Sequence, residues 1–393
     1  MNAQRLAGIL VAAAALGACR NSDDNGVAGI KLVPSSFAAN GCSGPDHVFT
    51  VGQTPAAGAL TVLQIGPFSQ LTAAGDSETL FATGDNATVV AIDVTAPIPV
   101  ETEILAAGAV AALLLTQGIA TAPVLSGISV LDSDSLLVVE HTSNTILKVD
   151  RHAVAAPEFF AGAPDEQGGF ANGTALAVPN NPQARFHFRG PTQIAVSDPL
   201  VPFVFVADNG NHAVRRIASG FVITVAGGGA PFFDDGDIAG AGFDSPSGLS
   251  VTCSGTLLVS ETGAAGVAGN RLRQLMLGPL SFFGQQGQVL TRAGNGVDAT
   301  IQGDGELASL AAPVSPLTTA MGDTYWIDST TGILRRMRGA TDTCDCPLWT
   351  DCAFAVTAGG DFSPGGVVSL TQTPLGVMFV LDATAGQLLK VTP

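Results

Sequence analysis

Five acidic residues recur at matching places along the chain, each directly after an apolar segment: Glu140, Asp208, Glu261, Asp328 and Asp382. Arginines follow some of them at a fixed distance, as Arg215 and Arg216 follow Asp208 by seven and eight positions. Such a pair could bind a ligand, or the acid and the arginine could satisfy each other in the core. Because the pattern returns in unit after unit, it favours the structural role, in which an arginine or turn amides hold a buried carboxylate.

Two other polar groups could bind a metal ion. The segments Asp234–Asp237 and Gly303–Gly305 place carboxylates on glycine turns, which suits calcium, but they lack the spacing and the terminal glutamate of an EF-hand. Of the five histidines, His141 and His212 occupy corresponding turns, and neither has a second histidine at metal-ligand spacing. We therefore expect no cofactor, with calcium as the alternative, and the sequence indicates no catalytic residues, because no nucleophile elbow, phosphate loop or dinucleotide motif is present.

The repeated acids lie in six similar segments, each with an apolar strand, a short turn and a second strand. The segments are Leu80–Ile92, Leu137–Val149, Phe205–Ile217, Leu258–Leu275, Tyr325–Met337 and Phe379–Val391. Thr83 takes the place of the acid in the first segment. The last aliphatic residue lies nine positions after the acid or threonine in five segments and fourteen in the fourth, where five extra residues fall within Gly263–Gly269. The segments are predicted to be β-hairpins.

Two further strands accompany each hairpin. One follows it and ends on a small residue and glycine, as at Ala226-Gly227, and one precedes the next hairpin, often after proline, as in Pro191–Val196. Six units of four strands without helical periodicity predict an all-β, six-bladed β-propeller over residues 60–393. Since no strand follows the sixth hairpin, we expect the N-terminal strand Thr61–Gly66 to complete the last blade and close the ring.

Several phrases resemble NHL-repeat propellers. The third unit reads Val-Ala-Asp-Asn-Gly-Asn-His-Ala-Val-Arg-Arg-Ile over 206–217, then Val-Ala-Gly-Gly-Gly over 225–229, and Gly-Asp-Gly-Glu over 303–306 repeats the phrase between blades. The likeness covers residues 60–393 and is weakest in the first two units. There the apolar stretch Ala109–Leu115 departs from the repeat, and we expect it to be a buried, extended strand. Six-bladed relatives include calcium-dependent lactonases and a zinc-dependent lyase, so the resemblance also admits metal-dependent chemistry at the central channel.

The first 18 residues have the layout of an export signal, with Arg5, an apolar stretch and small residues before Cys19. Leu16-Gly17-Ala18-Cys19 resembles the lipobox of bacterial lipoproteins, which implies cleavage before Cys19 and lipidation of that residue; an ordinary signal peptide is the alternative. Residues 19–59 would then be the lipidated N-terminus, tether and lead-in segment. The resemblance predicts a lipid-anchored protein outside the cytoplasm. Arg20 follows the cysteine instead of an inner-membrane retention aspartate, which favours the outer membrane.

Three of the six cysteines are close together near the C-terminus, at Cys344, Cys346 and Cys352. An exported protein can form disulfides, and this spacing matches no common zinc site, so we expect a disulfide within the cluster. The sequence leaves open which two of the three pair, and whether Cys42 joins the remaining one.

Composition excludes one class of partner and supports another. The chain has 33 acidic and 16 basic residues and a net charge of −17, so a nucleic acid is excluded. The longest apolar runs, Leu6–Ala18 and Ile104–Leu115, contain 13 and 12 residues, too few to span a bilayer, which takes about 20. We expect an envelope module that is attached to the membrane by its lipid and binds a protein or small molecule; a calcium- or zinc-dependent hydrolase or lyase is the alternative.

Overall fold

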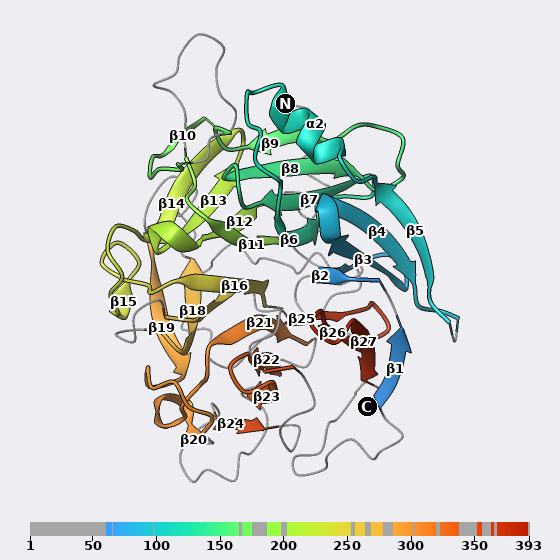
Figure 1. The fold of residues 1–393 in the computed structure, drawn as a ribbon. Coiled ribbons are helices and arrows are strands. Elements are labelled where there is room, and N and C mark those ends of the chain that lie inside the picture. Colours follow the sequence, from blue (N-terminus) through green and yellow to red (C-terminus); the bar gives the residue numbers. More distant parts are fainter. Residues whose placement is uncertain are drawn as a thin grey trace, which may run out of the picture.

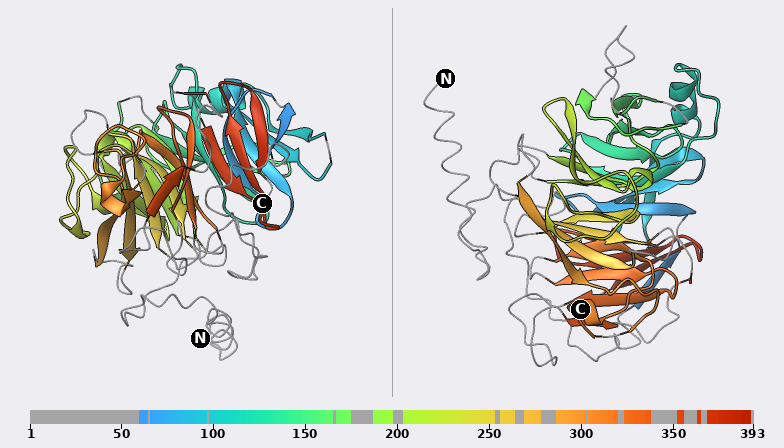
Figure 2. Two further views of the ribbon diagram at one scale, coloured as in Figure 1. Left: turned by 90° about the horizontal axis from the view of Figure 1, so that it is seen from below. Right: turned by 90° about the vertical axis from the view of Figure 1, so that its left-hand side faces the viewer.

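The computed structural model describes residues 60–391 except 65, 97, 165–166, 175–186, 198–202, 253–255, 264–268, 278–285, 302, 320–322, 338–351, 356–362 and 365–367. Within this part, six antiparallel sheets surround a common axis (Figures 1 and 2). The all-β, six-bladed propeller predicted from the repeats is confirmed. The described helices include none that is long and apolar enough to cross a membrane.

Blades 1, 2 and 6 have four strands each, from the axis to the rim. Blade 1 contains β2 (Phe68–Ala73), β3 (Thr79–Gly84), β4 (Thr88–Asp93) and β5 (Val100–Leu105). Blade 2 contains β6 (Leu125–Val130), β7 (Ser135–Glu140), β8 (Thr145–Asp150) and β9 (Glu158–Ala161). Blade 6 contains β25 (Val368–Gln372), β26 (Met378–Asp382), β27 (Gln387–Val391) and β1 (Leu60–Gln64).

Blades 3 to 5 have a fifth strand of two residues at the rim. Blade 3 contains β11 (Pro191–Val196), β12 (Val204–Asp208), β13 (Ala213–Ala218), β14 (Phe221–Gly227) and β10 (Gly173–Thr174). Blade 4 contains β16 (Pro246–Val251), β17 (Leu257–Glu261), β18 (Arg271–Leu277), β19 (Gly287–Ala293) and β15 (Gly236–Asp237). Blade 5 contains β21 (Pro313–Thr318), β22 (Thr324–Asp328), β23 (Ile333–Met337), β24 (Cys352–Ala355) and β20 (Gly303–Asp304).

The two ends of the described segment meet in blade 6. Strand β1 pairs antiparallel with β27 over five residues, from Leu60 opposite Val391 to Gln64 opposite Gln387. The six inner strands β2, β6, β11, β16, β21 and β25 contact one another in a complete circle around the axis. Blade 6 therefore takes its outer strand from the start of the segment and packs against blade 1.

Each interface between neighbouring blades has its own apolar core, and six separate clusters of buried residues occupy the six interfaces. All residues of β7 and β12 are buried, because the middle strands of a blade are covered on both sides. Hydroxyl groups add polar contacts beside the axis. Ser126 donates to the carbonyl oxygen of Pro191 on the next blade (3.1 Å), and Ser247 donates to that of Pro313 (3.3 Å). These contacts fix the inner strands that surround the channel.

The connection between blades 1 and 2 differs from the sequence prediction. Ala109–Leu115 forms a helix, α2, and the extended strand expected there is wrong. Val110 and Leu114 are buried on one face of the helix, and Leu115 is exposed. Alanine and leucine are strong helix formers, and residues four positions apart share a helix face, so one turn of helix buries both side chains where an alternating strand would not.

Candidate functional site

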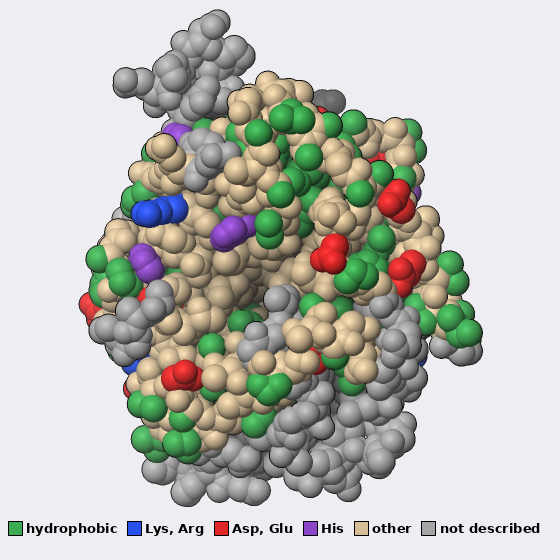
Figure 3. All heavy atoms as spheres, in the orientation of Figure 1, with side chains coloured by type: hydrophobic (Ala, Val, Ile, Leu, Met, Phe, Trp, Pro, Cys, Tyr) green, Lys and Arg blue, Asp and Glu red, His purple; other side chains and the backbone are tan. Residues whose placement is uncertain are grey.

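The repeated acids lie at one end of the propeller, where the second and third strands of each blade are joined. We call this end the turn face. The register places Pro191 opposite Asp208, Pro246 opposite Glu261 and Pro313 opposite Asp328, so the inner strands begin at the same end. Figure 3 shows this face, which is hollowed at the axis. Hairpin turns therefore surround one mouth of the channel.

In blades 3 to 5, each repeated acid lies against a buried arginine of the third strand. The nitrogen–oxygen distances are 2.9 Å for Arg215–Asp208, 3.0 Å for Arg273–Glu261 and 2.7 Å for Arg335–Asp328, and all six side chains are fully buried. Each guanidinium also binds the connection before its blade: Arg215 donates to the carbonyl oxygen of His187 (3.2 Å), Arg273 to that of Asp234 (2.7 Å) and Arg335 to that of Ile301 (3.1 Å). These pairs anchor the connections that carry the fifth strands.

The other blades satisfy the same position without an arginine. Glu140 accepts hydrogen bonds from the amides of Val124 (2.9 Å), Thr142 (3.1 Å) and Ser143 (2.6 Å). Asp382 accepts from the amides of Ser363 (2.7 Å) and Ala385 (2.9 Å), and the Thr83 hydroxyl lies 2.9 Å from that of Ser69. All five repeated acids are thus engaged inside their own blades.

Burial changes the acidity of these carboxyl groups. It raises the pKa of Glu261 to about 7, against the opposing charge of Arg273. Burial likewise raises the pKa of Asp208 and of Asp328, while Arg215 and Arg335 act in the opposite direction. A perturbed pKa often marks a functional site, but a site must also reach its ligand. These carboxyl groups are closed off from solvent, so their shifts follow from burial in the blade.

In the segment Asp234–Asp237, the carboxylate of Asp235 contacts the blade. Both Nε and Nη2 of Arg273 donate to Oδ1 of Asp235 (3.1 and 2.6 Å), and the amide of Thr291 donates to its Oδ2 (2.9 Å). Both carboxylate oxygens of Asp235 are therefore engaged by protein donors. The side chain of Asp304 lies outside the described residues, as do Cys19, Cys42, Cys344, Cys346 and the side chain of Cys352.

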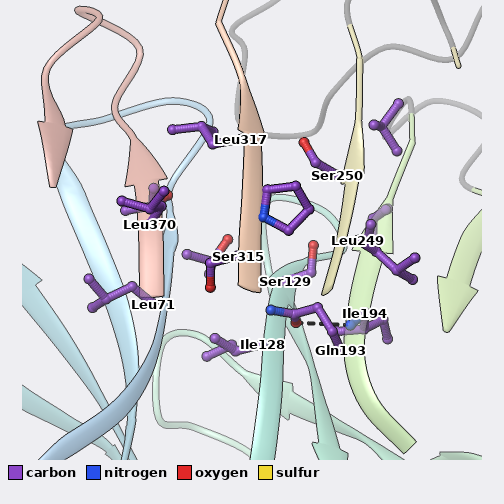
Figure 4. A pocket seen from close by; sticks show the side chains of 16 residues that line it. Leu71, Ile128, Ser129, Gln193, Ile194, Leu249, Ser250, Ser315, Leu317 and Leu370 are labelled. Carbon is purple, nitrogen blue, oxygen red and sulfur yellow. Dashed lines mark hydrogen bonds between the residues drawn. The ribbon is translucent and has the colours of Figure 1, made fainter. Parts of the chain in front are cut away.

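The axial channel contains a cavity of about 90 Å³. Leu71, Ile128 and Leu249 line it together with the hydroxyl groups of Ser129, Ser250, Ser315 and other inner-strand residues (Figure 4). Gln193 also lines the cavity, and its side-chain Nε2 donates to Oε1 of Gln70 (3.3 Å), which links blades 1 and 3 past Gly127. A Cβ at Gly127 would lie 2.8 Å from Oε1 of Gln193, so only glycine leaves this space.

The size and lining of this cavity limit what it can bind. Its volume equals that of about three waters and is far below the roughly 300 Å³ of a small-molecule pocket. None of the described residues that line it is acidic or a histidine. The described lining of the cavity therefore offers none of the carboxylate or imidazole ligands that a calcium or zinc site uses. In the described part of the chain, no three histidine, cysteine or carboxylate side chains form a set that could hold a metal ion.

The mouth of the channel on the turn face offers more accessible polar groups. His141 and Arg189 are exposed, and Asn209 and His212 are partly exposed. His141 Nδ1 lies 3.0 Å from the carbonyl oxygen of Pro191, and Asn209 donates to that of Pro246 (3.1 Å), so both turns rest on the next blade. Basic and histidine side chains gather on one side of the hollow in Figure 3. We take this mouth as the candidate functional site.

Sequence reasoning noted His141 and His212 but missed Arg189 and the glutamines across the channel. The signal for Arg189 was the scarcity of basic residues: only 16 occur in the chain, and two of them, Arg185 and Arg189, come just before the inner strand of blade 3. No sequence signal links Gln70 with Gln193, because the propeller fold brings together residues 123 positions apart.

Comparisons with known proteins identify the fold but no family. No family model matches the chain, and no curated protein matches it. Among solved structures, an auxiliary nutrient binding protein from Bacteroides ovatus is similar, with 9% identity and a TM-score of 0.55, over 84% of this chain and 70% of that one. The chain spans 57% of a longer protein of unknown function from Bacteroides thetaiotaomicron, with 15% identity over 72% of this chain and a TM-score of 0.47.

Two enzymes share the fold at the same level of similarity. One is a catalytically inactive variant of virginiamycin B lyase from Staphylococcus aureus with quinupristin, with 13% identity and a TM-score of 0.50 over 85% of this chain and 99% of that one. The other is a gluconolactonase from Xanthomonas campestris, with 13% identity and a TM-score of 0.50 over 84% and 88%. At such low identity these likenesses show the fold alone, since one propeller fold supports both binding and catalysis.

Proposed function

We propose that this protein is a lipid-anchored binding module of the bacterial cell envelope, an NHL-type propeller outside the cytoplasm that captures a small molecule or a partner protein at the turn-face mouth. One observation carries this proposal. The accessible polar groups His141 and Arg189 stand on turns fixed to the propeller, whereas all five repeated acids are engaged internally. The fold likeness to a nutrient binding protein supports a binding role.

The anchor belongs to the same proposal and has a direct test. Cys19 would carry the lipid, and residues 19–59 would tether the propeller to the outer membrane. In bacteria fed a labelled fatty acid, the wild-type protein should be labelled and the Cys19→Ser variant should not. Unchanged labelling of that variant contradicts the anchor and leaves the role of the propeller to be tested separately.

The binding role is tested against the metal-dependent hydrolase or lyase, which the fold likeness to a gluconolactonase and a virginiamycin B lyase supports. Purified protein is analysed for tightly held calcium and zinc and is assayed with a panel of lactones, esters and a streptogramin B. We expect no stoichiometric metal and no turnover. Stoichiometric metal together with turnover would overturn the binding proposal.

A positive measurement completes the test. Melting temperatures are recorded with a panel of neutral and acidic solutes, and a ligand is recognised by a concentration-dependent rise. The His141→Ala variant should lose that rise because its imidazole lies at the mouth. His152→Ala is the matched control, since the His152 imidazole pairs with exposed Asp134 away from the turn face. An equal response in both variants would remove the mouth as the binding site.

A further inference from the structure

Arg189 differs from every other described lysine and arginine. The others form ion pairs, hydrogen bonds or ring contacts, as Arg151 does with Asp76 and Lys148 with Glu158. Among the described residues, the Arg189 guanidinium alone has no such partner, and it is exposed. The net charge of the chain is −17, so an unpaired cation at the mouth is a local positive charge that attracts an anionic group.

The backbone and stem of Arg189 are held in place. Its amide donates to Oδ1 of buried Asp208 (2.7 Å), and its carbonyl oxygen accepts from the amide of Gly210 (2.9 Å). Two glycines make room for the stem: a Cβ at Gly168 would lie 3.2 Å from Cβ of Arg189, and one at Gly210 would lie 3.0 Å from its Cγ. The guanidinium is therefore carried on a fixed stem.

Two imidazole rings accompany Arg189 on the turn face. The ring of His141 lies over Gly190, the residue after Arg189: a Cβ at Gly190 would lie 3.3 Å from Cε1 of the ring. Nδ1 of His141 donates its hydrogen to the carbonyl oxygen of Pro191. Nδ1 of His212 accepts from the amide of Ser245 (3.1 Å), which leaves the hydrogen of the neutral ring on Nε2. Burial and the charge of Arg189 lower the pKa of His212, against the effect of Asp244, so its ring is neutral at pH 7.

We propose that Arg189 is the anchor of an anion subsite that takes the carboxylate of a small hydroxylated organic acid. This inference rests on the proposed binding function. A planar guanidinium can donate two parallel hydrogen bonds to a carboxylate, and the polar groups of His141 and Asn209 are available beside it for hydroxyl groups. The net negative charge of the protein disfavours a polyanion, because each further negative charge on the ligand adds repulsion. A ligand with a single carboxylate is repelled least.

The test is calorimetric titration of the full chain at low salt with three compounds: glucuronate, its uncharged relative glucose, and inorganic phosphate. We expect glucuronate to bind. Glucose should bind at least about tenfold more weakly, because it has no carboxylate for a charge-assisted pair with Arg189. Phosphate should also bind more weakly than glucuronate, because it has no hydroxylated ring to contact His141 and Asn209. Addition of about 0.2 M sodium chloride should weaken glucuronate binding, since the guanidinium is exposed.

Three variants assign the effect to one side chain. Arg189→Gln should weaken glucuronate binding about tenfold, and Arg189→Lys should weaken it less, since it keeps the charge and loses the planar fork. Lys148→Gln is the control, because it removes one positive charge away from the turn face and should leave the affinity within about twofold. Melting temperatures of all variants establish that each remains folded.

Three results would overturn the anion subsite: no glucuronate binding by the wild-type protein up to about 10 mM, equal binding by Arg189→Gln, or tighter binding of phosphate than of glucuronate. They are distinct from failure of the proposed function. Ligand binding that survives in Arg189→Gln keeps the binding module and removes only this subsite. Turnover with a tightly held metal removes the binding module, whatever Arg189 does to the affinity.

Discussion

The propeller has an arginine half and an aliphatic half. At the third residue of the third strand, blades 3, 4 and 5 have Arg215, Arg273 and Arg335. The same position in blades 1, 2 and 6 is Val90, Leu147 and Leu389. The arginine half has five-stranded sheets in the described part of the chain, and the aliphatic half has four-stranded ones.

This difference shows what the arginine contributes. A buried guanidinium satisfies the turn acid and also binds the backbone of the preceding connection, which then lies along the rim as a short strand. Blade 2 has Leu147 instead, and its acid Glu140 turns to local amides. The connection before it is not held by a guanidinium and forms α2. Both halves therefore share the fold of the blade, and the arginine determines how the connection before the blade is held.

A second difference does not follow the two halves. It lies in the turn residue before the third strand, which has a positive φ in all six blades. Asn144, His212 and Asn270 accept hydrogen bonds from the next blade, from the amides of Gly190 (2.7 Å), Ser245 (3.1 Å) and Ala312 (2.9 Å). The other blades have Ala87, Gly332 and Gly386, whose side chains offer no acceptor. This polar contact therefore joins blade 2 to blade 3, blade 3 to blade 4 and blade 4 to blade 5. The turn residues at the other three junctions have no side-chain acceptor for it.

The largest effect is expected at the junction of blades 6 and 1. Deletion of residues 60–66 removes the five residue pairs between β1 and β27, worth roughly 5 kcal/mol at about 1 kcal/mol each, and leaves an unpaired edge. Equilibrium denaturation should show lower stability of the whole domain. Deletion of residues 21–26, outside the propeller, is the control. Normal cooperative melting of the first variant would mean that β1 is dispensable.

The next effect is predicted in the arginine half. Arg273→Leu copies the aliphatic half into blade 4 and leaves Glu261 buried without its partner, which costs about 3–5 kcal/mol at neutral pH. Lys148→Gln breaks an exposed pair and should cost no more than about 1 kcal/mol. Urea denaturation measures both. A cost for Arg273→Leu equal to that of the control would show that the arginine contributes no more than an aliphatic side chain.

The pH dependence of stability offers a test of Glu261. Because its pKa is about 7 in the folded protein and 4.5 in the reference state, the unfolded chain loses this proton first as the pH rises. The free energy of unfolding should therefore fall between about pH 4.5 and pH 7, by roughly 3 kcal/mol, and this contribution should then level off. Glu261→Gln should lose that part of the pH dependence in denaturation curves. A pH profile identical to that of the wild type would place the titration elsewhere.

The sequence predicted the fold because each blade repeats a local pattern. The six hairpins, the proline-led inner strands and the longer connection between β17 and β18 could all be located from apolar runs and turn residues. The prediction was wrong at Ala109–Leu115, where the repeat is absent. There local helix preference and the burial of Val110 and Leu114 decide the structure, and strand periodicity had no competing signal.

The candidate site was much harder to predict. Asp208 and Arg215 are seven positions apart in one hairpin, so their pairing could be proposed from spacing. The mouth combines turns of different blades: His141 lies against Pro191, and Arg189 lies against Gly210. Such contacts depend on how the blades pack. The glycines that make room for them are Gly168, Gly190 and Gly210, and no sequence pattern distinguishes these three from the other 45 of the 48 glycines of the chain.

The smallest effect isolates the polar contact between blades. The Asn270 side chain accepts from the Ala312 amide (2.9 Å) and donates to the carbonyl oxygen of Gly296 (3.4 Å). Its φ is 58°, so Asn270→Ala adds the strain of a left-handed alanine, about 1 kcal/mol, to the loss of these bonds, for a total of about 2 kcal/mol. Asn270→Gly removes the bonds without the strain and should cost about 1 kcal/mol. Gly386→Ala gives the strain alone, because its Cβ would meet no atom within 4 Å. If Asn270→Gly is as stable as the wild type in urea, the side-chain bonds of Asn270 add nothing to the junction of blades 4 and 5.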